Sequence, residues 1–335
     1  MSELVENPES KAESREPKVE SPIATTQTVS RSSTLDSRQS PGQRAWRRFR
    51  RNRLAVGGAI FLIFILLFVL IYPFFSPFQP DQLSDAQFQP PSSTHWFGTD
   101  VHGRDLLVRL CYGAQISLLV GTVGALVSLI IGVLWGAIAG YAGGRLDSAM
   151  MRFVDVLYSM PAVIFAIVLM TAVEPWLKGW FATIGLPVKI ARLVVLFAAL
   201  GSVSWLTMAR IVRGQVLSLR TRPFVEASRV LGAGPMRILA RHIIPNVLGV
   251  VIVYLTLTVP AIILYESFLS FLGLGVQPPM ASWGSLIAEG VGQINPIRIY
   301  WWLILFPSAV LVSTLLALNY LGDGLRDAWD VKGGS

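Results

Sequence analysis

Apolar residues in this chain gather into long runs instead of alternating with polar residues. A helix rises about 1.5 Å per residue, so a run of roughly 20 apolar residues crosses the ~30 Å hydrocarbon core of a bilayer. Six runs approach or exceed this length, at 54–72, 116–141, 151–173, 191–209, 247–272 and 300–321. The pattern predicts an all-α polytopic membrane protein with six transmembrane helices.

The composition fits a membrane protein and argues against other classes. Hydrophobic residues make up 53% of the 335 positions and charged residues 14%, whereas an average soluble domain has about 25% charged residues. The net charge of +8 would suit nucleic-acid binding, but the basic residues flank apolar runs, so orientation in the membrane explains them better. A lone cysteine, Cys111, excludes an internal disulfide, and the three histidines lack a metal-ligand spacing. We therefore expect no metal or cofactor in this chain.

The N-terminal part divides into a polar tail and a basic segment. Residues 1–43 contain no Phe, Tyr or Trp, which predicts a disordered cytoplasmic tail. The stretch RAWRRFRRNR at Arg44–Arg53 predicts a short interfacial helix, with Trp46 and Phe49 on the lipid side and arginines facing the headgroups. A nucleic-acid-binding arm is the alternative, and a charged anchor is favoured. This helix, the first apolar run and the following loop form a segment at 44–112.

The distribution of basic residues predicts the orientation of the chain. Arginines are dense before the first run and between the fourth and fifth runs, while alternate loops hold fewer basic residues. Positively charged loops stay in the cytoplasm, so both termini and the loop between the fourth and fifth runs are expected there. The chain would then end in a cytoplasmic tail at 323–335.

Small residues recur at every fourth position along the second run. They are Gly124, Ser128, Gly132, Gly136, Gly140 and Gly144. On a helix this spacing makes a smooth ridge that lets another backbone approach closely. Internal packing and contact with a second membrane subunit fit the ridge equally well.

The loop between the fourth and fifth runs contains two short helical patterns. Phe224, Ala227 and Leu231 are spaced as the apolar set of an amphipathic helix. The sequence GAGP at 232–235 ends that helix and starts another, because glycine tolerates a left-handed conformation and proline suits a first helical turn. A compact pair of helices is one interpretation, and a merely interfacial loop is the other.

Particular motifs resemble those of a known family. EASRVLG followed by RHIIPN is similar to the EAA loop of bacterial ATP-binding-cassette (ABC) importer permeases, which Glu226, Ala227, Gly232 and Pro245 match at the family spacing. Ser228 replaces the second alanine of the pattern, His242 its isoleucine and Ile244 its leucine. HWFGTDVHGRDLLVR, GYAGGRLDSAMMRFVD, ARIVRGQVLSLR, ESFLSFLGLGVQPP and LGDGLRDAWD resemble the second permease subunit of peptide and nickel importers, most of all the oligopeptide branch.

The resemblance implies a type I (MetI-like) importer permease architecture, with a five-helix core at 113–322 and a coupling loop at about 210–245. It implies a homologous second permease, two cytosolic ATPases, an extracytoplasmic peptide-binding protein and a peptide substrate. The implied ATPase-coupling residues are Glu226, Ala227, Ser228, Gly232, Ala233, Gly234 and Pro245. Because the chain lacks G-x-x-x-x-G-K-[ST], ATP and Mg would bind the partner ATPases, and this chain would not be an enzyme. Dipeptides, nickel chelates and other small solutes remain open as cargo.

Ionisable residues outside the loop offer further candidates. Glu266 lies inside the fifth run, where a carboxylate must face protein or water; it lines the transport pathway or makes a structural hydrogen bond, and the second is favoured. Asp100, Arg104 and Asp105 would meet the binding protein, or form a local ion pair that holds their loop. An ion-coupled transporter would need more ionisable residues within the spans, and an intramembrane enzyme would need a motif such as H-E-x-x-H, which the sequence lacks.

Overall fold

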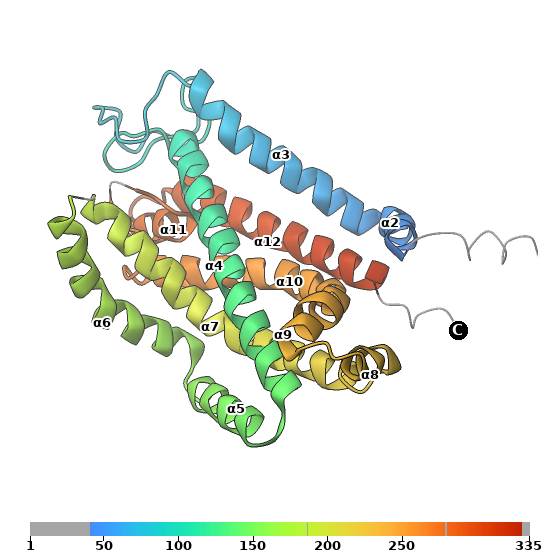
Figure 1. Ribbon diagram of the computed structural model, residues 1–335. Coiled ribbons are helices and arrows are strands. Elements are labelled where there is room, and N and C mark those ends of the chain that lie inside the picture. Colours follow the sequence, from blue (N-terminus) through green and yellow to red (C-terminus); the bar gives the residue numbers. More distant parts are fainter. Residues whose placement is uncertain (1–40, 186, 279, 330–335) are drawn as a thin grey trace, which may run out of the picture. The chain divides into compact units, whose positions relative to one another are not determined.

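The computed structural model describes residues 41–185, 187–278 and 280–329, so the expectation of a disordered tail falls almost wholly outside the described residues. Within them, six helices are long and apolar enough to cross a membrane, which confirms the predicted number and the all-α class. They are α3 (Arg53–Phe75), α4 (Leu106–Ala142), α6 (Ala162–Thr183), α7 (Val188–Leu219), α10 (Ile244–Phe271) with the turns before it, and α12 (Trp301–Trp329) (Figure 1).

Shorter helices connect these spans. They are α2 (Pro41–Arg51), α5 (Gly144–Tyr158), α8 (Pro223–Val230), α9 (Pro235–Ile238), the π-helix η1 (Leu239–Ile243) and α11 (Trp283–Gly292). Asn52 caps the start of α3 by accepting a hydrogen bond from the Ala55 amide, and Asp105 caps α4 by accepting one from Val108. Such caps satisfy amides that a helix leaves unpaired at its beginning.

The third span differs in position from the prediction at 151–173. The chain forms two helices there, because α5 ends at Tyr158 and α6 begins at Ala162, directly after Pro161. Proline disfavours a helical conformation in the residue before it, so the chain turns at this point. The average hydrophobicity of the segment does not reveal the turn, since α5 is itself rich in apolar residues. The membrane span is α6, which extends to Thr183.

The small residues of α4 lie against neighbouring helices of the same chain. Gly132, Gly136 and Gly140 face α7 so closely that an added methyl group would meet Met208, the Ala209 carbonyl and the Arg213 carbonyl. The ridge therefore serves internal packing along most of its length. Gly124 lies against Ile262 of α10, and Ser128 is fully buried. Gly144 follows the end of α4, and the space around it is open.

The fifth span begins earlier than its apolar run, because α9, η1 and α10 form one continuous helical segment from Pro235 to Phe271. Pro245 has no amide hydrogen and would ordinarily disturb such a helix. The π-helix removes this conflict: the Ile244 amide bonds five residues back to Leu239, and the side-chain amide of Asn246 donates to the His242 carbonyl at 2.5 Å. The widened turn thus allows a proline near the base of a membrane span.

Helix α12 continues through Trp329, past the expected tail boundary at 323. Ala328 is buried in a cluster with Ala45, Phe49 and Ala55, so the end of α12 packs on α2 and on the start of α3. Residues 330–335 of the expected tail lie outside the described residues.

Candidate functional site

The loop between α7 and α10 forms a structured elbow, residues 223–243, made of α8, a glycine turn, α9 and η1 (Figure 1). Pro223 occupies the first turn of α8, and Gly232, two residues after the end of α8, adopts φ +80°. Val225 is fully buried and anchors α8 in a cluster with Ile238 and Ile243. The elbow is therefore held to the bundle by its own apolar core.

The outward side of the elbow displays large apolar side chains beside charged residues such as Glu226, Arg229 and Arg237. Val230 and Leu231 are each 87% exposed and Met236 is 75% exposed. Phe224 and Ala227, two members of the expected apolar set, are exposed as well. Sequence periodicity therefore located the apolar face of α8, whereas the residue that anchors the helix, Val225, was missed.

The expected coupling residues differ in exposure. Ala233 is half-buried, whereas Glu226, Gly232, Gly234 and Pro245 are exposed. Ser228 and His242, which depart from the family pattern, lie next to each other: Ser228 Oγ is 3.5 Å from His242 Nε2 and donates to the Phe224 carbonyl at 2.8 Å. Two departures from the pattern thus meet at one contact between α8 and η1.

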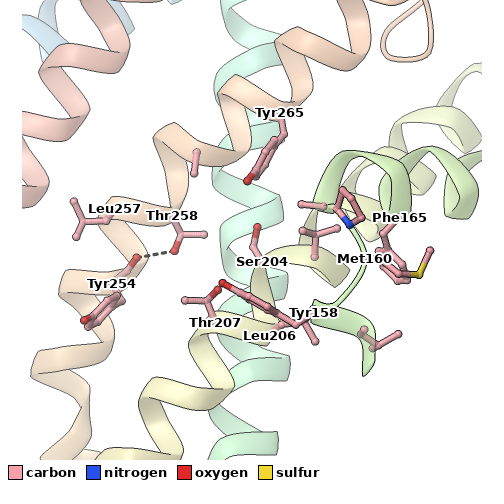
Figure 2. A pocket seen from close by; sticks show the side chains of 15 residues that line it. Tyr158, Met160, Phe165, Ser204, Leu206, Thr207, Tyr254, Leu257, Thr258 and Tyr265 are labelled. Atoms are coloured by element: carbon pink, nitrogen blue, oxygen red, sulfur yellow. Dashed lines mark hydrogen bonds between the residues drawn. The ribbon is translucent and has the colours of Figure 1, made fainter. Parts of the chain in front are cut away.

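A cavity of about 500 Å³ opens between the α5–α6 turn, α7 and α10. Its lining includes six hydroxyl-bearing residues: Tyr158, Ser204, Thr207, Tyr254, Thr258 and Tyr265. Figure 2 shows Ser204 and Tyr265 on neighbouring helices beside this space, and the dashed line marks Thr258 Oγ1 donating to the Tyr254 carbonyl at 2.7 Å. None of the residues that line the cavity carries a charge.

Sequence reasoning did not find this cavity, although a signal was present. Tyr254, Thr258, Ala261 and Tyr265 follow one face of α10 at spacings of four, three and four residues. Polar groups on one face of an otherwise apolar span indicate a surface that faces protein or water rather than lipid.

Glu266 lies outside the residues that line the cavity. Its side chain is fully buried and accepts hydrogen bonds from Ser270 Oγ at 2.6 Å and from Ser117 Oγ at 2.9 Å. The two serine hydroxyls in turn accept bonds from the backbone amides of Val276 and Trp283, at 3.0 and 3.3 Å. Glu266 therefore ties α10 to α4 and to the segment that leads into α11.

Asp100, Arg104 and Asp105, for which the sequence left open a local ion pair or a contact with a binding protein, belong to a network of ion pairs. Asp100 Oδ2 is 2.7 Å from both Arg104 Nε and Arg109 Nη1, and Arg109 also forms a two-point contact with Glu289 of α11. Asp105 Oδ2 is 2.9 Å from His95 Nδ1. Asp100 and Asp105 are buried, so their carboxylates hold this region together from within.

Two ion pairs fix α5 to α7. Asp147 binds Arg213 through both oxygens, at 2.5 and 2.7 Å, and the adjacent guanidinium holds the pKa of Asp147 below its ordinary value. Asp155 pairs with Arg210 at 2.7 Å, and the Arg210 guanidinium lies 4.0 Å from the centre of the Tyr158 ring. Because Tyr158 lines the cavity, this second pair stands at its edge.

Comparison with known proteins gives the family. Residues 132–332 match the model of the binding-protein-dependent transport system inner membrane component, and residues 40–91 match the N-terminal TM domain of oligopeptide transport permease C. No group of His, Cys, Asp or Glu in the described part of the chain could hold a metal ion.

Relatives of known name cover most of the chain. The oligopeptide transport system permease protein OppC of Haemophilus influenzae is 46% identical over 89% of this chain and 92% of its own length. The dipeptide permease DppC of Bacillus subtilis is 46% identical over 87% of this chain and 85% of its own length. For OppC of Escherichia coli the identity is 46%, with coverages of 87% and 91%.

The fold has a counterpart among solved structures. An inward-facing conformation of the MetNI methionine ABC transporter aligns with a TM-score of 0.50 and 19% identity, over 66% of this chain and 96% of that one. This likeness supports the MetI-like architecture. The family model and the relatives lead to one conclusion: the chain belongs to the family of inner-membrane components of binding-protein-dependent transport systems.

Proposed function

We propose that this chain is a permease subunit of an ATP-driven importer of oligopeptides. In this proposal it pairs with a homologous second permease and receives cargo from an extracytoplasmic peptide-binding protein. The names of its relatives, oligopeptide and dipeptide permeases, support a peptide cargo. Dipeptides, nickel chelates or another small solute are the alternative cargo for the same role.

The exposure of large apolar side chains on the elbow is the observation that carries the proposal. A water-exposed segment gains nothing by displaying Val230, Leu231 and Met236, so a partner is expected to cover them. A short helix that lies in a groove of another protein is a common mode of recognition. The proposed partner is a cytosolic ATPase, which places the elbow and both termini in the cytoplasm, as the density of arginines in this loop also favours.

Within this docking surface the proposed roles differ. Glu226 is exposed on α8 and would accept hydrogen bonds from the ATPase. Ala227, Ser228, Ala233 and Gly234 have small side chains that permit close approach, and Pro245 lies at the start of α10. ATP and Mg would bind the ATPases, whose closure would move the paired permeases between two states.

The elbow can be tested with a variant that alters only its surface. Leu231→Ser should leave the thermal unfolding of the chain unchanged, because the side chain is exposed, yet weaken ATPase co-purification by about 10- to 100-fold, since burying a leucine contributes roughly 1.5–3 kcal/mol. Glu226→Ala should reduce peptide uptake in the same assay. Uptake and co-purification at wild-type levels in both variants would refute the docking proposal.

The backbone of the elbow offers a second, independent test. Gly232 has φ +80°, which a β-branched residue rarely adopts. Gly232→Val should therefore distort the turn between α8 and α9 and abolish uptake. Gly57→Val, at an exposed position of α3 with open space around it, is the control and should transport normally.

The uncharged cavity is the proposed contribution of this chain to the peptide path. Its hydroxyl groups can hydrogen-bond peptide amides, and the absence of charge in its lining avoids discrimination between acidic and basic peptides. At the opposite end of the spans, the region held by Asp100, Arg104 and Asp105 is the proposed meeting point with the binding protein. Charge reversal at Arg104, which is half-buried, should reduce uptake while leaving ATPase co-purification unchanged.

A further inference from the structure

Helix α2 has two chemically opposite faces. Ala45 and Phe49 are buried against Ala55 and Ala328, so the prediction that Phe49 faces lipid was wrong. Successive residues of a helix are turned by about 100°, which places Arg47, Arg50 and Arg51 on the face directly opposite. All three side chains are exposed, and the sequence from 41 to 53 contains no acidic residue. The face of α2 opposite Ala45 and Phe49, called here the basic face, therefore carries three exposed arginines and no acidic residue.

The position of α2 along the bundle is fixed by close contacts. Gly324 of α12 lies directly against Ala55 of α3, and the Phe49 ring borders the same point. Ala55 belongs to the first turn of the apolar span α3, so we place the edge of the hydrocarbon near it. The layer of headgroups beyond that edge is roughly 5–7 Å thick. In Figure 1, α3 is seen along its length, whereas α2 is seen almost end-on. The axis of α2 therefore runs across the end of α3.

The chemistry of the basic face matches a phosphate layer. Guanidinium groups bind phosphate oxygens through two parallel hydrogen bonds. Trp46, which is 61% exposed, lies between the two faces, and tryptophan favours the membrane–water interface. A basic group close to an anionic bilayer gains about 1 kcal/mol of binding free energy.

We propose that α2 is a binding site for the headgroups of anionic phospholipids, with Arg47, Arg50 and Arg51 as the phosphate contacts. Its opposite face holds the first turn of α3 and the last turns of α12 together. Bound headgroups therefore stabilise the junction between these two spans. The site is independent of the peptide path and of the elbow.

The test is a lipid titration of the full chain, purified in a neutral detergent with the subunits that accompany it. Phosphatidylglycerol should raise the unfolding temperature, whereas phosphatidylcholine and inorganic phosphate should not. Replacing Arg47, Arg50 and Arg51 by Gln should raise the half-saturating phosphatidylglycerol concentration about a hundred-fold, at roughly five-fold per arginine. Replacing the same three by Lys should preserve most of the response, because the charge remains.

A control with the same loss of charge separates a local site from general attraction. Arg145, Arg152 and Arg298 are exposed elsewhere, and their joint replacement by Gln should leave the lipid response intact. An unchanged response in the Arg47, Arg50 and Arg51 variant would overturn the proposal, as would an equal response to inorganic phosphate. Loss of a co-purifying subunit with a normal lipid response would show that α2 docks protein instead.

Discussion

Glu266 illustrates how a single buried acid can be structural. An unpaired carboxylate in a membrane span is costly, but this one receives hydrogen bonds from Ser117 and Ser270 and lies outside the residues that line the cavity. The neighbouring residue in the chain, Tyr265, does line the cavity. Two adjacent residues of α10 therefore face different surroundings: Tyr265 faces the proposed peptide path, and Glu266 faces the hydrogen-bond network of buried serines.

The effect of substituting Glu266 on folding and uptake should depend on whether its hydrogen bonds are kept. Glu266→Gln keeps an acceptor oxygen, so we expect near-normal folding and uptake. Glu266→Leu deprives the buried hydroxyls of Ser117, Ser267 and Ser270 of this acceptor and should lower the free energy of unfolding by about 1–3 kcal/mol per hydroxyl. Thermal unfolding and protein level measure the effect. Glu266→Gln protein that is stable but inactive would place this side chain in the pathway after all.

The pair between Asp147 and Arg213 should make stability depend on pH. Because the folded state lowers the pKa of Asp147, the pair stabilises the protein at pH values above the ordinary carboxyl pKa. That contribution is lost as the pH falls through the lowered value. Asp147→Asn should therefore cost about 1 kcal/mol at neutral pH, a modest figure because Arg213 is one-third exposed.

Unfolding curves at several pH values measure this effect. The difference in stability between the wild type and Asp147→Asn should shrink as the pH drops below about 4. A difference that stays constant well below about pH 4 would mean that the ion pair contributes nothing to it. Ser148, next in the chain and exposed, offers a control in Ser148→Ala, whose effect should not vary with pH.

At the scale of elements, the close packing of α4 on α7 depends on glycines of α4, which place no side chain between the two helices. The nearest neighbour of Gly136 is the Ala209 carbonyl, a backbone atom that cannot rotate away. Lipid offers no hydrophobic drive for helices to associate, so close contact of this kind supplies much of their attraction. The pairing of the two helices should therefore tolerate little change at this position.

Gly136→Ala tests this packing with one methyl group. We expect a loss of about 1–3 kcal/mol in stability, because overpacking forces the helices apart. Gly57→Ala adds the same group to an exposed helical position with open space and should be neutral or stabilising, since alanine has the higher helix propensity. Equal unfolding temperatures for the two variants would contradict the proposed role of the ridge.

At the scale of the whole molecule, distant segments combine to form the cavity. It needs the turn at Pro161, one face of α7 and one face of α10. The pair between Asp155 and Arg210 holds α5 beside it, and the elbow continues directly into α10. Movement of the elbow by a partner would therefore reach a helix that lines the cavity.

Filling the cavity should block transport without unfolding the protein. Ala261 is exposed and lines the space, so Ala261→Trp should abolish peptide uptake while leaving unfolding temperature and ATPase co-purification unchanged. Leu264→Trp, three residues further along α10 and outside the lining, is the matched control and should transport normally. Uptake at wild-type rates by Ala261→Trp would remove this cavity from the path.

The sequence by itself determined the features that depend on local composition and spacing. The length of apolar runs predicted six spans, because crossing a bilayer requires a fixed helical rise. The glycines and proline at 232–235 predicted the break within the elbow, because they act on the backbone of their own segment. The spaced motifs predicted the family, which the comparisons confirm.

Only the tertiary structure decided which face of each helix meets which neighbour. In a bilayer, surfaces that face lipid and surfaces that face protein are both apolar, so hydrophobicity does not separate them. The partner of the α4 ridge, the inward position of Val225 and the burial of Glu266 all depend on contacts between residues far apart in the chain. The cavity has the same origin, because its lining comes from three segments that meet only after folding.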